Sequence, residues 1–187
     1  SRRAAFAILN DIFFQRKNLD EAFARCNLFE GLSGRDRAFV RLLVSVVLKR
    51  RVELDAALSR LLHEPLSALK PQQLLNVFRL GIAQFAFLET KAHAVVNTTV
   101  DLAEAEGIEH HKSLVNAVMR RLTREGFIHA DPRDAGKINT PDWLWQQWMQ
   151  DYGVEKALDI TAAHLAEAPA GFSVKCDAKV WAQKMEA

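Results

Sequence analysis

The sequence predicts an all-α fold, and three observations support this prediction. Apolar residues recur at helical spacing over seven successive stretches before any strand-like segment appears. The connections between these stretches are short, which favours a compact bundle, and no segment repeats at a fixed period as a solenoid requires. The 187 residues are 49% hydrophobic, which is enough to supply a core. We therefore expect a helical bundle over residues 1–126, followed by a linker and a smaller second unit.

The first two expected helices lie within residues 2–26. Both carry apolar side chains at i, i+3, i+4 and i+7, namely Ala5, Ile8, Leu9, Ile12 and Phe13, then Leu19, Ala22, Phe23 and Cys26. A third helix is expected over residues 33–51, because Ser33 can cap it and Asp36 follows three residues later, close to a capping box. Leu54 and Leu58 indicate a short fourth helix that ends before Pro65.

A fifth helix is expected over residues 71–89, with Pro71 in its first turn. Its buried stripe is predicted to contain Leu74, Leu75, Phe78, Ile82 and Phe85. Gly81 costs roughly 1 kcal/mol in a helix interior relative to alanine. We therefore expect Gly81 to permit a close crossing with another helix.

Two further helices complete the expected bundle. The sixth begins near His93 and closes at Gly107. The seventh covers residues 109–125 and closes at Gly126, its expected C-cap.

After Gly126 the sequence becomes rich in proline, glycine and charge, so residues 127–140 are expected to form a linker. Thr140 as N-cap and Pro141 at the first helical position start a helix that ends at Gly153. A partner helix over residues 154–168 follows. These features predict a second unit over residues 141–187.

The end of the second unit contains the one convincing strand, residues 172–176, and a helix capped by Asp177 that is cut off at Ala187. A single strand leaves its backbone groups unpaired and cannot close a sheet. We therefore expect residues 141–187 to be the truncated start of an α/β subdomain, cut from a longer protein.

Composition excludes several classes of protein. No run approaches the roughly eighteen apolar residues that span a bilayer, and the N-terminus lacks a signal-peptide cleavage pattern, so no membrane partner and a cytoplasmic location are expected. Cys26 and Cys176 lie 150 positions apart and form neither a disulfide framework nor a CxxC site. His110 and His111 point to different helix faces, and His93 has no ligand partner at suitable spacing, so no metal site is expected.

Charge is distributed unevenly along the chain. Residues 1–126 hold 19 Lys/Arg and 14 Asp/Glu, a net charge of +5, whereas residues 127–187 hold 6 and 9, a net charge of −3. The first part of the chain is therefore the basic one. This bias suggests a polyanionic partner, although a solvated basic surface would give the same count.

The second unit carries three tryptophans close together, Trp143, Trp145 and Trp148. They can bury one tryptophan face against the partner helix, which is the interpretation we favour. The alternative is a platform on which nucleic-acid bases stack.

Several segments together resemble a known family. They are LSGRDRAFVRLLVSVVLKR, FRLGIAQFAFLE, HAVVNTTVDLAE and LVNAVMRRLTR. The resemblance is to the NusB-type helical domain, in the version fused to the N-terminus of RsmB/Sun-type rRNA cytosine-5 methyltransferases. It spans roughly residues 2–126 and continues more weakly to the segment FSVKC. One departure concerns the acidic residue that usually follows the first asparagine of the family, because Thr98 stands there; any role of that acid does not carry over.

The resemblance implies that ribosomal RNA is the partner and that basic side chains of the bundle contact it, since arginine suits phosphate geometry. The expected RNA-binding residues are Arg2, Arg3, Arg35, Arg37, Arg41, Lys112, Arg120, Arg121 and Arg124. The resemblance also implies a downstream methyltransferase domain of the same chain, which would hold S-adenosylmethionine and the catalytic cysteines. The present sequence has no glycine-rich turn for that cofactor. We therefore expect this chain to have no catalytic, cofactor-binding or metal residues and to be the RNA-engaging accessory region.

Asn97 and Asn116 have two interpretations on this basis. The favoured one makes them half-buried residues whose amides tie the sixth and seventh helices to neighbouring backbone; the other places them in an RNA-facing groove. Two other functions also stay open for the whole chain. One is a free-standing NusB-like antitermination factor, and the other is a structural module that docks the downstream domain without touching RNA.

Overall fold

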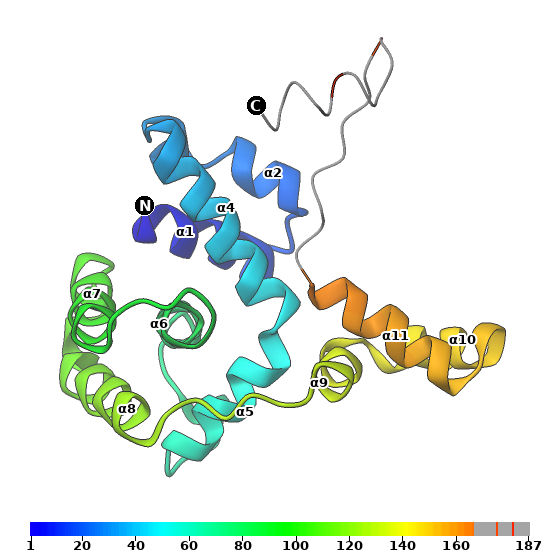
Figure 1. Ribbon diagram of the computed structural model, residues 1–187. Coiled ribbons are helices and arrows are strands. Elements are labelled where there is room, and N and C mark those ends of the chain that lie inside the picture. Colours follow the sequence, from blue (N-terminus) through cyan, green and yellow to red (C-terminus); the bar gives the residue numbers. More distant parts are fainter. Residues whose placement is uncertain (167–174, 176–180, 182–187) are drawn as a thin grey trace.

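The computed structural model describes residues 1–166 together with Lys175 and Trp181, and these residues form helices and no strands (Figure 1). The expected all-α fold is confirmed for this part of the chain. The α-helices of residues 1–126 are α1 (Arg2–Phe14), α2 (Leu19–Ala24), α3 (Asn27–Glu30), α4 (Gly34–Lys49), α5 (Arg51–Leu61), α6 (Leu74–Phe87), α7 (Ala92–Ala105) and α8 (Lys112–Glu125). Two 3₁₀ turns, η1 (Leu66–Ala68) and η2 (Glu109–His111), precede α6 and α8. Beyond them lie α9 (Pro132–Asn139), α10 (Asp142–Tyr152) and α11 (Val154–Leu165).

Helix α6 is the centre of the bundle. It contacts α1, α4, α5, α7 and α8, which surround it (Figure 1). The expected stripe residues Leu74, Leu75, Phe78 and Ile82 are buried, and Phe85 is partly buried. The burial also goes beyond a stripe, because every residue from Leu74 to Gln84 is buried and this part of the helix is enclosed on all sides. Sequence periodicity identifies a helix with one buried face, whereas enclosure depends on how many other helices pack around it.

Gly81 confirms the expected close crossing. A Cβ atom at this position would lie 2.7 Å from Thr99 Oγ1 and 2.9 Å from the Cε atom of Met119. The absence of a side chain therefore lets α6 approach both α7 and α8.

Pro71 is not in the first turn of the fifth helix, as the sequence suggested. It follows a cis peptide bond and precedes α6 by three residues. The Pro71 carbonyl accepts the amide of Leu74 at 3.0 Å, so a tight turn leads into the helix. Proline favours both the first turn of a helix and a turn that precedes a helix, so its position in the sequence does not distinguish the two.

The threonines in α7 satisfy their hydroxyl groups on their own helix. Thr98 Oγ1 donates to the Ala94 carbonyl at 2.8 Å, and Thr99 Oγ1 donates to the Val95 carbonyl at 2.7 Å. This back-bonding explains how polar residues are accommodated in an apolar helix. The favoured interpretation is wrong for Asn97, which is exposed. Asn116 is half-buried as expected, but its side chain accepts from Arg120 of the same helix, at 3.1 Å, rather than from neighbouring backbone.

Helix ends follow the expected capping chemistry in most places. Ser33 Oγ accepts the Asp36 amide at 3.2 Å and caps α4. Gly126 and Gly153 end α8 and α10 with φ of 79° at both, a conformation that glycine adopts without strain. Thr140 does not cap α10, because Pro141 occupies that position and the Thr140 hydroxyl donates to the Gly136 carbonyl at 2.8 Å.

The expected linker over residues 127–140 contains a helix. Helix α9 begins after Asp131, whose side chain accepts the Arg133 amide at 3.0 Å, and Pro132 occupies its first turn. It packs against α5 of the bundle and against α11. A Cβ atom at Gly136 would lie 2.6 Å from the backbone of Thr161, so this glycine permits the contact with α11. The basic and acidic parts of the chain are therefore joined by a packed helix.

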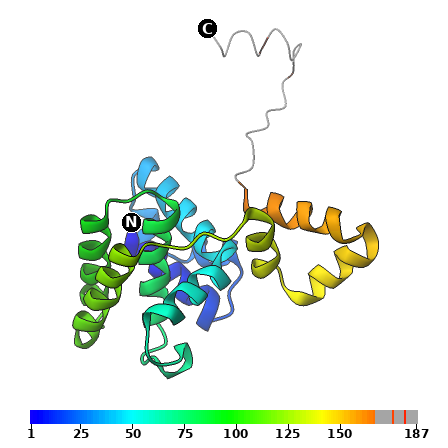
Figure 2. The same cartoon turned by 60° about the horizontal axis from the view of Figure 1, so that its bottom comes forward.

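Helices α10 and α11 form a hairpin at the end of the molecule farthest from α7 and α8 (Figures 1 and 2). The strand expected over residues 172–176 lies, apart from Lys175, outside the described residues. The helix expected after Asp177 also lies outside them, apart from Trp181, so the proposed α/β subdomain over residues 141–187 stays a prediction.

Candidate nucleic-acid interface

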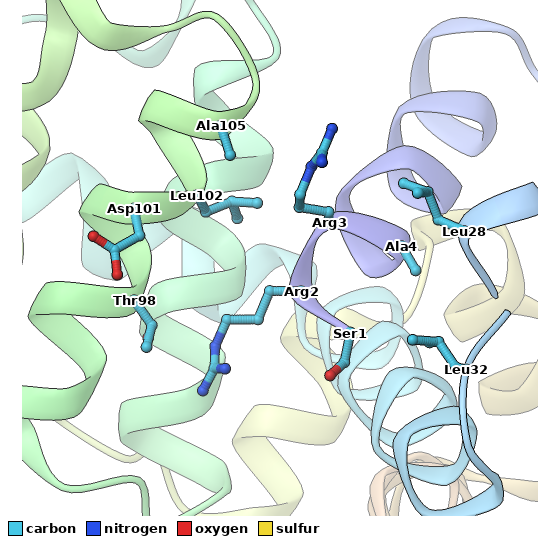
Figure 3. Close-up of a pocket in the computed structure, with 10 residues that line it drawn as sticks. All are labelled: Ser1, Arg2, Arg3, Ala4, Leu28, Leu32, Thr98, Asp101, Leu102 and Ala105. Carbon is cyan, nitrogen blue, oxygen red and sulfur yellow. The ribbon is translucent and has the colours of Figure 1, made fainter.

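The first turn of α1 borders a hollow of about 390 Å³ (Figure 3). One wall comes from α7 through Thr98, Asp101 and Leu102, and the other comes from Leu28 and Leu32. Arg2 and Arg3 project from the first turn of α1 toward opposite ends of this hollow (Figure 3). The structure thus brings two of the expected RNA-binding residues to one site, but it points them in different directions.

Arg2 is held by the protein itself. Its Nε donates to the side-chain oxygen of buried Gln84 at 2.6 Å, and its guanidinium lies 5.6 Å from the centre of the Phe39 ring. Burial lowers the pKa of Arg2, and the charge of Asp101 opposes that effect. Arg2 therefore anchors α1 to the central helix, and its guanidinium is already engaged by Gln84 and Phe39.

Arg3 and Lys112 each face a carboxylate near the end of α7. Arg3 Nε lies 2.6 Å from Glu106, and Lys112 Nζ lies 2.7 Å from Glu104. The hydrogen bond with Glu104 raises the pKa of Lys112. Both cations are exposed, but the adjacent carboxylates reduce the positive potential that a ligand would meet at these positions.

The three arginines of α4 do not form a common surface for a ligand. Arg37 donates to the carbonyls of Leu32 and Glu30, at 3.0 and 2.7 Å, and so closes the loop before its own helix. Arg41 covers the rings of Phe23 and Phe29, with its guanidinium 5.2 and 5.1 Å from their centres. Arg35 is exposed next to Asp36. Of the three, Arg35 is the residue best placed to meet a polyanion.

Helix α8 presents the second group, which we call the α8 arginine surface: Arg120, Arg121 and Arg124. Arg121 Nε lies 2.8 Å from Glu125, and its Nη1 donates to the Leu61 carbonyl at 3.2 Å. Arg124 is 74% exposed and lies 3.6 Å from the same Glu125. Arg120 is also exposed, and its Nε donates to the neutral side-chain amide of Asn116 at 3.1 Å.

The Glu125 carboxylate therefore serves two of the three guanidiniums of the α8 arginine surface, those of Arg121 and Arg124. The hydrogen bond from Arg121 lowers the pKa of Glu125, which stays ionised at neutral pH and cancels one of the three positive charges. The surface keeps an excess of positive charge, unlike the α7 end of the bundle, where Arg3 and Lys112 are each matched by an acid.

The ends of α5 and α8 add features that sequence reasoning missed. Arg60 is exposed. It precedes Leu61, whose carbonyl accepts a hydrogen bond from Arg121 Nη1. A hollow of about 310 Å³ lies beside this contact and is lined mainly by apolar side chains, with His63, Glu64 and Arg121 as its polar groups. Leu61 and Arg121 are 60 residues apart in sequence, so only the packing of α5 on α8 brings the end of α5 to the α8 arginine surface.

The α8 arginine surface and the start of α4 lie at opposite ends of the bundle, at the bottom and the top of Figure 1. The nine residues expected to bind RNA thus fall into at least two separate groups. A single short RNA segment would meet one group rather than both.

Other candidate sites gain little support from the structure. Among the described residues, no cluster of three His, Cys, Asp or Glu side chains could hold a metal ion. Trp148 packs edge-on against His164 of the partner helix, with ring centres 5.0 Å apart, in line with the favoured interpretation of the tryptophans. Trp143 is 70% exposed, and no residue of α10 is fully buried. No helix in the described part of the chain has the length and apolar character needed to cross a membrane.

Comparison with known sequences gives a match over the helical bundle. Residues 1–124 match the NusB family. The chain is 35% identical over 171 residues to the ribosomal RNA small subunit methyltransferase B of Xanthomonas campestris pv. campestris, covering 89% of this chain and 37% of that protein. A probable ribosomal RNA small subunit methyltransferase B of Synechocystis sp. is 34% identical over 160 residues, covering 82% and 36%. The corresponding probable enzyme of Bacillus subtilis is 30% identical over 141 residues, covering 72% and 31%.

The chain thus spans about a third of the length of these curated relatives. A solved structure titled "Crystal Structure of a Plectonemic RNA Supercoil" contains a chain with the same fold, at a TM-score of 0.60 and 23% identity. The match covers 66% of this chain and 91% of that one. At this identity the likeness bears on the fold alone.

Proposed function

The chain belongs to the NusB family, and from that premise we propose that it is the RNA-binding region of a S-adenosylmethionine-dependent rRNA cytosine-5 methyltransferase. The family match agrees with the resemblance seen in the sequence. Relatives named ribosomal RNA small subunit methyltransferase B support the link to rRNA modification. In this proposal the chain engages ribosomal RNA for a catalytic domain elsewhere in the parent protein.

The observation that carries the proposal is the unbalanced charge of the α8 arginine surface. Arg121 and Arg124 share the Glu125 carboxylate, Arg120 contacts the neutral Asn116 amide, and Arg124 is 74% exposed. Guanidinium groups suit phosphate oxygens because their donors form a planar fork. Contacts with phosphates would position an RNA helix without reading its sequence.

Arg3, Arg35 and Lys112 would make a secondary contribution. Arg3 and Lys112 are paired with carboxylates, which a phosphate would have to displace. Arg37 and Arg41 hold loops and aromatic rings in place, so their replacement would disturb the fold before it affected binding. We therefore assign the main RNA contact to α8.

The cofactor of the parent enzyme has no evident place in the described residues. S-adenosylmethionine would supply the methyl group, and a Rossmann-like domain holds it at a glycine-rich turn between a strand and a helix. The described residues form no strand, and the glycines with positive φ among them, Gly107, Gly126 and Gly153, follow helix ends. These residues do not fit the cofactor, and we propose that it binds in the downstream domain.

Amide hydrogen exchange with and without a structured rRNA fragment tests this assignment. We expect RNA to slow exchange in the last two turns of α8 and at the end of α5, around Leu61. Helix α10, in the acidic part of the chain, is the internal control and should not change. Protection confined to α10 and α11, or no protection anywhere, would contradict the proposal.

A further inference from the structure

Helix α10 presents an apolar stripe that the described residues cover only in part: Trp145 is partly buried, with the Lys137 ammonium 5.1 Å from the centre of its ring. The α10 stripe consists of Trp145, Met149 and Tyr152, whose spacing of i, i+4 and i+7 places them on one helix face. Tyr152 is 53% exposed and Met149 is 36% exposed. Trp145 borders a hollow of about 480 Å³ between α9 and α10, which Ile138, itself 46% exposed, also lines.

The packing of α10 within its hairpin uses a different set of side chains. Leu144 and Trp148 face α11, where Trp148 meets His164, and both are partly buried. No residue of α10 is fully buried, although six of its eleven residues are apolar or aromatic. Contiguous exposed apolar surface of this kind marks an interaction site in a soluble protein.

The charge around the α10 stripe argues against RNA as its occupant. The hollow beside Trp145 is lined by Asp131, Asp134 and Asp142, with Lys137 as the single cation. Residues 131–165 contain three Lys/Arg and six Asp/Glu, a net charge of −3. Stacking of bases on exposed tryptophans works together with a positively charged groove that tracks the backbone. Here the phosphates would meet carboxylates.

We propose that the α10 stripe docks the catalytic domain that follows this chain in the parent protein. The inference rests on the proposed function, in which the relatives' additional length, about two thirds of each, includes that domain. The α10–α11 hairpin extends away from the bundle (Figures 1 and 2), so a domain can reach it without covering the α8 arginine surface. The tether itself favours docking, because it keeps the local concentration of the domain high.

The chemistry of the stripe specifies the matching surface. The docking patch of the catalytic domain presents apolar side chains at its centre, to cover Trp145, Met149 and Tyr152. Basic side chains at its rim face Asp131, Asp134 and Asp142. The carboxylates then set the orientation of the domain, while the apolar contact supplies most of the affinity.

The test uses the full-length parent protein with three substitutions, Trp145→Ser, Met149→Ser and Tyr152→Ser. A matched control carries Trp143→Ser, Gln146→Ser and Gln150→Ser, which introduce the same number of serines on the opposite face of α10. All three control positions are exposed. Circular dichroism of each variant verifies that the helices are retained.

We expect the stripe variant to have a larger radius of gyration by small-angle scattering, and to be cleaved between its domains roughly tenfold faster or more, because apolar anchors dominate such contacts. The control variant should match the wild type in both measurements. A folded stripe variant as compact and as protease-resistant as the control would overturn the proposal.

Three other results would also overturn it. The first is that chain 1–187 alone forms dimers that the stripe substitutions abolish, which would make a second copy the occupant. The second is a loss of RNA affinity in the stripe variant of chain 1–187, which would assign the surface to RNA. The third is that acrylamide quenches the tryptophan fluorescence of chain 1–187 no more than that of the parent protein. Failure of RNA binding by the α8 arginine surface would refute the proposed function and leave the docking measurement unaffected.

Discussion

The side-chain amide of Asn139, at the end of α9, donates to the buried carboxylate of Glu53 in α5 at 2.9 Å, across 86 residues of sequence. The amide oxygen of the same side chain accepts the backbone amide of Val52 at 3.0 Å, in the first turn of α5. Arg50 completes the site, 2.9 Å from the Glu53 carboxylate. Asn139 thus caps α5 of the bundle from the end of α9 and joins the two helices.

Replacing Asn139 with alanine should weaken this junction. The change leaves one donor, Arg50, on the Glu53 carboxylate and removes the cap of α5, so we expect the free energy of unfolding to fall by about 1–3 kcal/mol. Amide exchange at Val52 and Glu53 should become faster. Gln147→Ala is the control, because its hydrogen bond to Asp151 is exposed. Unchanged exchange at Val52 and Glu53 would show that the junction does not depend on Asn139.

The crossing at Gly81 gives a second prediction. Gly81→Ala would place a methyl group 2.7 Å from Thr99 Oγ1, and the resulting shift of packed helices should cost about 1–3 kcal/mol. Gly34→Ala is the matched control, because a Cβ atom there has no neighbour within 4 Å. Urea denaturation compares the two variants. Equal stability of the two would mean that α6 and α7 separate more easily than the structure implies.

The pH dependence of stability should include a contribution from Asp36. Hydrogen bonds from the hydroxyl groups of Ser1 and Ser33 lower the pKa of its carboxyl group in the folded protein. The ionised carboxylate therefore stabilises the fold above the ordinary carboxyl pKa of about 4, and this contribution is lost as the pH falls through the lowered value. Asp36→Asn should consequently flatten the decline in the urea midpoint between about pH 5 and pH 2.

Asp142→Asn serves as the control for Asp36→Asn, because it removes the same formal charge from the first turn of another helix. Parallel declines in the wild type and in Asp36→Asn would mean that the hydroxyl contacts do not persist in solution.

Local signals explain which parts of the fold were predictable. The cap at Ser33 and the glycines at 126 and 153 act within a few residues of the helix ends they define, so the sequence is sufficient to identify them. The burial of α6 on every side depends on five other helices and has no local signal. Helix α9 did have one, since Asp131 followed by Pro132 is typical of a helix start, but the surrounding glycine and charge favoured a linker.

The candidate RNA-binding residues were also predictable only in part. Basic residue types identify positions that could meet a phosphate, but they do not show which of them the protein already uses. Arg37 is occupied by carbonyls, and Arg41 covers two phenylalanine rings brought to it by the turn of α2 and α3. Arg120 and Arg124 lie one helical turn apart on the same face of α8, and both stay exposed.

The central claim is that the α8 arginine surface binds ribosomal RNA through phosphates, and the salt dependence of affinity tests it most directly. The measurement compares wild-type protein with Arg120→Gln/Arg124→Gln, a pair that avoids the Leu61 contact of Arg121. The matched control is Arg133→Gln/Lys156→Gln, which removes two positive charges from residues 127–187, the acidic part of the chain. We expect the slope of log K against log salt to weaken by somewhat less than two units in the α8 variant, with affinity roughly tenfold lower for unrelated structured rRNA fragments. The control should keep the wild-type slope. A wild-type protein without salt-dependent binding, or a folded α8 variant with the wild-type slope, would contradict the account.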